Sequence, residues 1–482
     1  MEGIDTQTVL QPSTGWLLLA VFGSIWIGLG IYWGRKAKNL EGFMLAGRNV
    51  GLALGAATAM ATWVTSNTVM VAPSLAMRQG IWGMVAYSTA CFGLLLFAPM
   101  ALRIKNLIPK GYTSGDFIYK RYGRVAWGIF MTITSVYSLA WLVTMGVAGG
   151  KLIEVLTGIP YEYGMSVILF VCVAYTLFGG LFAVIGTDFI QSIIILIGVV
   201  AIGGVILSRL EMPEIYQSIE TTQPALLDVF MPVALLSFFN LMFFGWGEVF
   251  HNNVWWSRAF AIRKKVVSKA FLLAGFCWFP IPIAAGFIAL SAAPLGINII
   301  DPDTTAPLVA SYLLGGTGAV LVFIVVFCSL ASSIDSLLAA TADLLTEDVY
   351  KRLIRPQASD AELRRGASII IIGIGLLTWA ICWPKWDLLM VLYISGPLVA
   401  STIWPIVAGL FWQKSNPTAS CLAMLLGSMI GLWAYFSIAW YVATLVSTVV
   451  SMLIVVIGTL IFPKPCDWRR IAGADHTQPD NG

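Results

Sequence analysis

The chain has 482 residues, of which 59% are hydrophobic and 11% are charged, and 46 of them are glycine. This composition excludes an ordinary soluble core and is typical of a polytopic membrane protein. The formal net charge is +4, and no basic run interleaved with aromatic residues points to nucleic-acid binding. We therefore expect an all-α membrane protein without a separate soluble domain.

Apolar runs long enough to cross a bilayer predict about 13 membrane helices. Each crossing needs about 20 apolar residues to span roughly 30 Å of hydrocarbon. The first run is too long for a cleaved signal peptide and has no Lys or Arg before it, so we expect it to stay in the mature protein. The predicted spans are 15–34, 52–76, 82–102, 126–150, 160–178, 186–208, 230–257, 270–292, 317–343, 367–383, 387–411, 417–437 and 440–462.

The basic residues predict how the chain is oriented. Alternate loops and the C-terminal tail contain 24 of the 28 Lys and Arg residues, and only Arg78, Lys151, Arg209 and Lys385 fall on the other side. By the positive-inside rule, the N-terminus lies outside and the C-terminus in the cytoplasm. The plasma (inner) membrane is the expected location.

The chain offers little that would support an enzyme. It has only two histidines, His251 and His476, which argues against a His-ligated metal centre. No nucleophile paired with a base stands out either. We expect a protein that is not an enzyme.

A cluster of hydroxyl groups interrupts one very apolar stretch, FCSLASSIDSLLAATADLLTEDVY at 327–350. In a helix, serines at i, i+3, i+4 and i+7 share one face, from which Asp335 points about 120° away. The hydroxyls could let helices pack closely, or they could supply oxygen ligands to a monovalent cation without a full buried negative charge. The serines are Ser329, Ser332, Ser333 and Ser336.

Two predicted spans have features of discontinuous membrane helices, which free backbone carbonyls for ions and substrates. The first is AMATWVTSNTVMVAPS at 59–74, a polar patch with Pro73 inside a span. The second is FFNLMFFGWGEVFHNNVWW at 238–256, where we predict a break at Gly245-Trp246-Gly247. Four spans separate these two helices.

This spacing predicts two five-helix units that repeat, made of spans 2 to 6 and 7 to 11. The chain then divides into residues 1–50, with the extracellular N-terminus, a peripheral helix and a cytoplasmic loop, and residues 51–208, the first repeat. The second repeat with its leading loop is 209–412. Two peripheral helices and the cytoplasmic tail are 413–482.

The stretch FGGLFAVIGTDFIQSIIILIG at 178–198 resembles the signature of the sodium:solute symporter family. The GR of FMLAGRNVG and the SLASSIDS and TEDVY runs resemble the same family in the same order, so the resemblance covers 15–462. Within the family, GEVFHNNVWWSRAFA and KNLIPKGYTSGDFIYKRYG are similar to the urea-transporting branch.

The resemblance implies a LeuT-type inverted-repeat fold, with one peripheral helix before a ten-helix core and two after it. It also implies sodium-driven uptake, with Na+ as the coupling ion. Position by position, the family's sodium ligands match the carbonyls of Ala61, Val64 and Ser329 and the hydroxyls of Ser332 and Ser333.

The resemblance places the substrate in the cavity between the two helix breaks. Thr65 and Thr68 continue the face of the first break, Trp141 aligns with a family position that lines this cavity, and Trp246 and Glu248 come from the second predicted break.

Glu248 bears on the chemistry of the solute, because a carboxylate at mid-membrane depth is costly and usually functional. It would favour a solute rich in N–H donors and repel a carboxylate. The alternative is that it caps the inner half-helix, whose positive dipole end stabilises it.

Two further carboxylates, Asp188 in the signature and Asp343, sit closer to the cytoplasm, and we predict that they line the exit route of the ion. The alternative role of each is a helix-end or interfacial carboxylate.

The predicted function is a sodium-coupled symporter that imports a small polar solute by alternating access, with urea, an amide or an amine favoured. The alternative is sodium-coupled uptake of an amino acid or a short carboxylate. A passive channel would need a continuous polar pore, and a solute sensor would need a signalling module, for which the tail leaves little room. The expected partners are the solute, the sodium ion and the lipid bilayer.

Overall fold

The computed structural model describes residues 9–472 except 38, 210, 229 and 298–300. Helices make up nearly all of this part, and a single isolated bridge joins Val50 to Ile262. In chain order the elements are α1 (Pro12–Gly34), α2 (Leu40–Leu45), η1 (Ala46–Arg48), α3 (Leu52–Trp63), α4 (Ser66–Gln79), α5 (Ile81–Ser88), α6 (Cys91–Leu107), α7 (Ser114–Tyr122), α8 (Arg124–Thr157), α9 (Tyr161–Arg209), α10 (Met212–Thr222), η2 (Pro224–Leu227), α11 (Pro232–His251), α12 (Asn253–Ala261), α13 (Val267–Trp278), α14 (Pro280–Leu290), η3 (Pro302–Thr304), α15 (Thr305–Leu344), η4 (Leu345–Ile354), α16 (Asp360–Cys382), α17 (Leu388–Ala400), α18 (Ile403–Phe411), α19 (Pro417–Ser437), α20 (Trp440–Ile461) and α21 (Trp468–Ala472).

The described ranges contain 11 helices or helix pairs that are long and apolar enough to cross a membrane. One of them, α9, has 49 residues and would be about 73 Å long if it were a single straight helix. Its backbone leaves helical geometry at Gly180 (φ 52°, ψ −147°). The last turn of α1 lies against both sides of this point, because Cβ atoms built at Gly34 and Gly186 would meet Phe178 and Trp33. The chain therefore reverses at Gly180.

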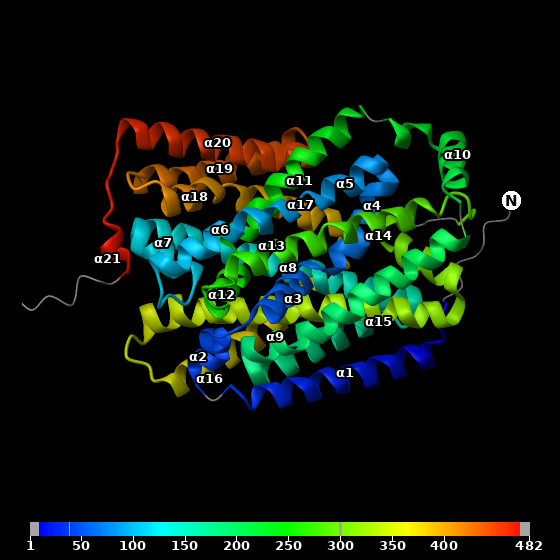
Figure 1. Cartoon of the computed structure of the whole chain (residues 1–482), viewed down its shortest axis with the longest axis horizontal. Coiled ribbons are helices and arrows are strands. Elements are labelled where there is room, and N and C mark those ends of the chain that lie inside the picture. Colours follow the sequence, from blue (N-terminus) through cyan, green and yellow to red (C-terminus); the bar gives the residue numbers. More distant parts are fainter. Residues whose placement is uncertain (1–8, 38, 210, 229, 298–300, 473–482) are drawn as a thin grey trace, which may run out of the picture.

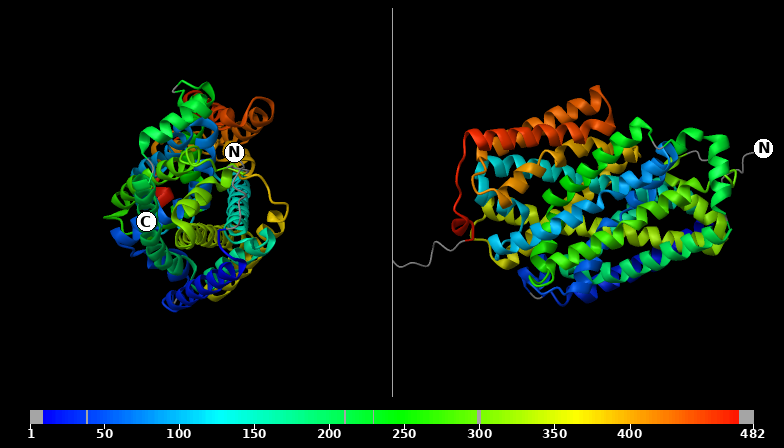
Figure 2. Two further views of the ribbon diagram at one scale, coloured as in Figure 1. Left: turned by 90° about the vertical axis from the view of Figure 1, so that its right-hand side faces the viewer. Right: turned by 45° about the horizontal axis from the view of Figure 1, so that its top comes forward.

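Counting α9 as two crossings and the α3–α4 pair as one discontinuous crossing gives the thirteen that the sequence predicts. The crossings run side by side along the long axis of the molecule, with the C-terminal helices at one edge and α1 at the opposite edge (Figure 1). Seen end-on, they surround a central group of helices (Figure 2). α1 packs mainly on α9, and α20 packs on α11, α17 and α19. The predicted peripheral helices are thus on the outside of the bundle.

The first predicted helix break is present. α3 ends at Trp63, Val64 has non-helical torsions (φ −80°, ψ 83°), and α4 begins at Ser66. Thr65 and Thr68 form a reciprocal capping box, in which each side chain accepts a hydrogen bond from the other residue's backbone N–H at 3.2–3.3 Å. These two hydroxyls offer the backbone an alternative to the helix, which explains why it stops here.

The second break lies at a different place from the one predicted at Gly245-Trp246-Gly247. α11 continues through both glycines to His251, and the break is at Asn252, whose side chain caps α12 by accepting from Val254 N–H at 3.0 Å. The glycines serve close packing instead. A Cβ at Gly245 would lie 2.5 Å from Ala90 Cα, and one at Gly247 would lie 2.7 Å from the backbone of Val399.

Candidate functional site

Two serine hydroxyls connect α15 to the end of α3. Ser332 Oγ donates to the carbonyl oxygens of Ala61 at 3.0 Å and Ser329 at 3.1 Å, and Ser333 Oγ donates to those of Thr62 at 3.2 Å and Ser329 at 2.9 Å. Both serines are fully buried. Residues 271 positions apart thus meet at the first helix break, and one of the carbonyls found there belongs to Thr62, which the predicted ion site did not include.

The break explains why these carbonyls are available. The last carbonyl groups of a helix have no partner within the helix, and the N–H of Thr65, which would bond to Ala61 in a continuous helix, bonds to Thr68 Oγ1 instead. Two carbonyls from α3, one from α15 and two hydroxyls form a set of neutral oxygen donors. Hard oxygen donors of this kind fit a hard cation such as sodium. Val64, the remaining predicted ligand, lies in the break itself.

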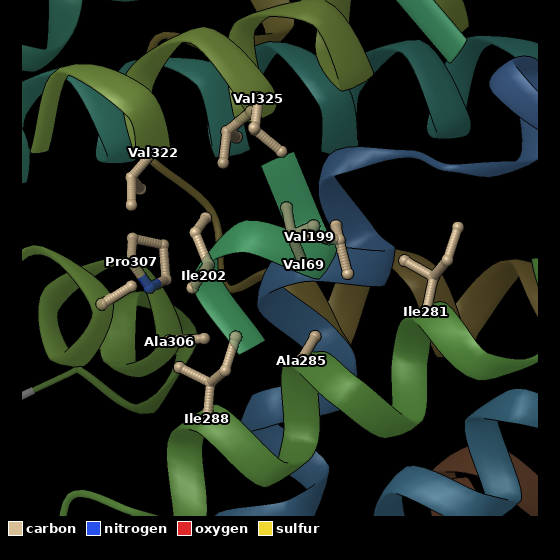
Figure 3. Close-up of a pocket in the computed structure, with 12 residues that line it drawn as sticks. Val69, Val199, Ile202, Ile281, Ala285, Ile288, Ala306, Pro307, Val322 and Val325 are labelled. Carbon is tan, nitrogen blue, oxygen red and sulfur yellow. The ribbon is translucent and has the colours of Figure 1, made fainter. Parts of the chain in front are cut away.

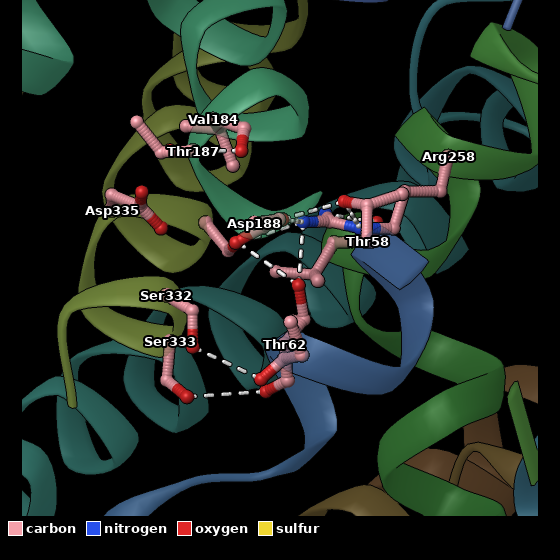
Figure 4. A network of polar contacts seen from close by, with 12 residues as sticks. Thr58, Thr62, Val184, Thr187, Asp188, Arg258, Ser332, Ser333 and Asp335 are labelled. Carbon is pink, nitrogen blue, oxygen red and sulfur yellow. Dashed lines mark hydrogen bonds and ion pairs between the residues drawn. The ribbon is translucent and has the colours of Figure 1, made fainter. Parts of the chain in front are cut away.

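A buried ion pair lies near this serine pair (Figure 4). Arg258 of α12 and Asp188 of α9 are both 0% exposed, and Arg258 Nη2 lies 3.2 Å from Asp188 Oδ2. The same guanidinium donates to hydroxyls of α3 and α15 at 2.6–3.1 Å, and these belong to Thr58, Thr62 and Ser336. One arginine therefore joins α3, α9, α12 and α15.

Arg258 follows the predicted span 230–257 and was thereby counted among the basic residues of the loops, and this assignment is wrong. Its basic side chain is on a short helix that the second break directs into the bundle, where Asp188 and three hydroxyls satisfy it. Its position five residues before the Arg-Lys-Lys run at 263–265 hid this difference, because a loop arginine and a buried one look alike in a sequence.

The two carboxylates of α15, Asp335 and Asp343, lie outside this network of hydrogen bonds. Asp335 is fully buried and accepts from Tyr175 OH of α9 at 2.8 Å, so it faces α9 rather than α3. Asp343 is also buried, and its Oδ2 has no hydrogen-bond partner within the described residues. Asp188 and Asp343 are both closed off from solvent in this conformation.

A small cavity lies next to the first break. Its walls are mostly aromatic, and three predicted substrate residues, Thr65, Trp141 and Glu248, line it. The cavity leaves about 30 Å³ for the centres of water-sized molecules, where about 10–15 Å³ holds one water. The other lining residues are Trp63, Asn67, Tyr87, Ala90, Tyr137, Leu241, Phe244, Trp278 and Leu392.

Glu248 links this cavity to the second break. It is 1% exposed, and its Oε2 accepts from Trp255 Nε1 of α12 at 3.0 Å, while Oε1 has no partner among the residues described. The cap of α12 is Asn252. Glu248 is therefore not the helix cap that the sequence analysis offered as its alternative role.

The remaining two predicted substrate residues are not in the cavity wall. Thr68 Oγ1 donates to Trp63 O at 3.1 Å and completes the capping box, so backbone groups already engage this hydroxyl. Trp246 is half-buried and packs on Phe243 with ring centroids 4.8 Å apart. Because α11 does not break at Trp246, the Trp246 side chain keeps its helical direction and contacts Phe243 instead of lining the cavity.

Sequence reasoning also missed cavity residues, among them Asn67, Tyr137 and Trp278. Asn67 follows the first break within the stretch already identified as polar, which was the available signal. Tyr137 and Trp278 belong to apolar helices, where an aromatic residue gives no indication of which neighbour it faces.

A second cavity has no polar side chain in its wall (Figure 3). It lies between α4, α9, α14 and α15 and is lined by Val, Ile, Ala and Pro side chains, including Val69, Val199 and Ile281. Such a wall cannot orient a polar solute by hydrogen bonds.

A discontinuous helix, a buried hydroxyl pair beside it and a small enclosed cavity are features of secondary transporters built from inverted repeats. The chain belongs to the sodium:solute symporter family, whose sequence profile matches residues 43–427. Membership of a family of symporters agrees with the expectation that the chain is not an enzyme.

Several relatives are named as urea transporters. The chain is 26% identical to the urea-proton symporter DUR3 of Oryza sativa over 87% of its length, and 23% identical to the urea active transporter of Saccharomyces cerevisiae over 90%. It covers 64% of each of these longer proteins. The high-affinity proline transporter PutP of Bacillus subtilis is 25% identical over 84% of this chain and 89% of that protein.

Solved structures share the fold. A Na+-coupled sialic acid symporter in a substrate-bound outward-open state matches with a TM-score of 0.77 and 16% identity, over 96% of this chain and 100% of that chain. MhsT in complex with L-phenylalanine matches with a TM-score of 0.56 and 14% identity, over 83% and 97% of the two chains. The predicted LeuT-type architecture is confirmed.

Proposed function

We propose that this protein is a sodium-coupled symporter that imports a small polar solute rich in N–H donors by alternating access. Its N-terminus lies outside and its C-terminus in the cytoplasm. The observation that carries the choice of solute is Glu248, a buried carboxylate in the wall of the cavity at the first helix break.

Burying a carboxylate is costly unless donors or a cation compensate it. Glu248 has one neutral donor, Trp255 Nε1, and no Lys or Arg is among the residues that line the cavity in the described part of the chain. A solute with N–H groups would supply the missing donors. A solute with a carboxylate would add a second negative charge, which is unfavourable at short range in a medium of low polarity.

The size of the cavity supports a small solute. Its free volume suits a molecule of a few heavy atoms, such as urea, a short amide or a small amine. Relatives whose names include urea match over 87–96% of this chain.

The coupling ion in this proposal is sodium, bound by the carbonyls of Ala61, Val64 and Ser329 and by the hydroxyls of Ser332 and Ser333. The hydroxyls would then turn their lone pairs toward the ion. Asp188 and Asp343 line the exit route, which opens when the Arg258–Asp188 ion pair separates. The name of the rice relative raises a proton as the alternative ion.

A second candidate is sodium-coupled uptake of an amino acid, which the proline transporters among the relatives favour. Proline carries a carboxylate, and Glu248 argues against it on this chain. A passive channel and a solute sensor are the candidates from other classes.

The test is uptake into proteoliposomes that contain the purified full chain. Urea, acetamide, methylamine, proline and acetate are supplied under an inward sodium gradient, a proton gradient of equal size, or neither. Sodium-driven uptake of an N–H solute, with counterflow of labelled solute, is expected. Uptake driven only by the proton gradient would show that the coupling ion is a proton and not sodium. Uptake of proline or acetate alone would show that the proposed solute class is wrong. Solute flux without counterflow of labelled solute would indicate a channel. Solute binding without flux would indicate a sensor.

A further inference from the structure

We propose that Trp63, Asn67 and Glu248 together recognise one carbonyl oxygen and two N–H groups of a neutral, planar solute of the urea or primary-amide class. This inference rests on the proposed function and narrows its solute, because it excludes amines. It assigns specificity to two residues, Trp63 and Asn67, that the ion and substrate predictions did not include.

The starting observation is a set of polar atoms without partners. Trp63 Nε1, Asn67 Oδ1 and Glu248 Oε1 are each buried and form no hydrogen bond with any residue that the structure describes. All three side chains line the same cavity. Buried polar atoms are nearly always paired, and leaving one unpaired costs about 1–3 kcal/mol. Three such atoms around one cavity indicate that a ligand supplies the partners.

The chemistry of the three atoms defines that ligand. An indole N–H only donates, an ionised carboxylate only accepts, and the amide oxygen of asparagine accepts. The cavity therefore presents one donor and two acceptors. A ligand that complements the cavity has one acceptor and at least two donors. A carbonyl group flanked by NH₂ groups meets this requirement.

Two of the three groups are held in place by a hydrogen bond from or to another side chain. Asn67 Nδ2 donates to Thr144 Oγ1 at 3.4 Å, which directs the amide nitrogen toward α8. Trp255 Nε1 donates to Glu248 Oε2, which leaves Glu248 Oε1 to accept from a ligand. Because these partners orient the side chains before a solute arrives, little conformational freedom is lost on binding.

Aromatic rings favour a flat solute. The Trp63 ring lies against three other indoles, with centroids 4.9 Å from Trp255, 5.8 Å from Trp278 and 6.1 Å from Trp141. Rings in a cavity of this size leave room for a planar molecule of about four heavy atoms, and urea has that shape. An amine has no acceptor for Trp63 Nε1, and a carboxylate has no donors for the other two groups.

Two pairs of solutes with matched shape separate the roles of the residues. Acetamide replaces one NH₂ of urea by a methyl group, so the two N–H groups of a single nitrogen have to serve both acceptors, which lie on different helices. Guanidinium replaces the carbonyl oxygen of urea by an NH₂ group and carries a positive charge, so it has no acceptor to offer the Trp63 donor. Comparing affinities within each pair cancels general effects of a substitution on the protein.

The experiment measures the binding of urea, acetamide and guanidinium to the purified full chain in saturating sodium. Asn67→Leu keeps the shape of the side chain but removes the acceptor, so it should lower the affinity for urea relative to acetamide by about 3- to 10-fold, the worth of one hydrogen bond. Trp63→Phe removes the N–H donor together with part of the ring and should lower the affinity for urea relative to guanidinium by a similar factor. Ser74→Ala, on the same helix as Asn67 but outside the cavity wall, is the control and should change neither ratio.

The outcomes distinguish this inference from the proposed function. If the wild type binds urea or acetamide and both ratios stay unchanged in the variants, the three-point recognition is wrong while the proposed solute class stands. If the wild type binds neither and instead takes up an amine, the narrowed class is wrong although an N–H solute is transported. If Asn67→Leu does not fold, Asn67→Ala makes the same prediction for the ratio of urea to acetamide.

Discussion

The hydroxyls of Ser332 and Ser333 join α15 to the end of α3 and can be removed with little loss of volume. Under the proposed function, Ser332→Ala and Ser333→Ala each remove one sodium ligand, so each should raise the sodium concentration for half-maximal uptake while the melting temperature without sodium changes little. Ser329→Ala is the matched control, because its hydroxyl bonds Val325 O of its own helix at 2.9 Å and only its carbonyl is a predicted ligand. Unchanged sodium dependence in both variants would remove this site.

The carboxylate of Glu248 can be tested with an isosteric change. Glu248→Gln removes the charge but keeps an acceptor for Trp255 Nε1. If the carboxylate accepts hydrogen bonds from the solute, solute binding should weaken by about 1.5–3 kcal/mol, the usual worth of a hydrogen bond to a charged group. Sodium binding without solute should change little. Calorimetric binding and the melting temperature of the same purified variant decide the matter, and a loss confined to stability would argue against solute contact.

Gly245 and Gly247 of α11 lie at close helix contacts, and substitution there should have the opposite effect on stability from substitution of a glycine in an exposed helix. Gly→Ala in an exposed helix interior stabilises by about 1 kcal/mol, whereas Gly245 and Gly247 lie too close to the backbone of Ala90 and Val399 for a methyl group. Gly245→Ala and Gly247→Ala should therefore lower the melting temperature. Gly373→Ala on α16, where nothing lies within 4 Å of the new methyl group, should leave the melting temperature unchanged or raise it. A gain in all three variants would contradict the packing role.

The buried ion pair acts at the level of the whole molecule, because Arg258 connects four helices that are distant in sequence. Arg258→Gln leaves the Asp188 carboxylate without its cation and should destabilise the protein by about 3–5 kcal/mol. Asp188→Asn in the same chain removes that unpaired charge, so the double variant should be more stable than Arg258→Gln alone. A double-mutant cycle of unfolding free energies measures this coupling. Additive losses would show that the two side chains do not depend on each other.

Much of the architecture can be predicted because its signals are local. An apolar run of about 20 residues predicts a crossing wherever it occurs, and α19 and α20 begin at the predicted residues Pro417 and Trp440. The first break could also be predicted, since Thr65 and Thr68 cap α4 through contacts only three residues apart. The boundaries of the two repeats remain a prediction.

The positions of the second break and of the cavity could not be predicted from the sequence, because both depend on contacts between helices. Glycine is compatible both with a break and with close helix packing, and only the neighbours Ala90 and Val399, more than 150 positions away in sequence, decide between them at α11. The alternative signal was Asn252, a residue type that favours helix N-caps.

The membrane class, the number of crossings, the first break and the serine face of α15 could all be predicted, because each follows from composition or from residues within a few turns of one helix. The tertiary structure decided what those features face. Ser332 reaches a carbonyl 271 residues away, and Arg258 lies in the bundle rather than in a loop. The physical reason is that burial and hydrogen-bond partners are set by contacts between helices, which the local pattern of a chain does not specify.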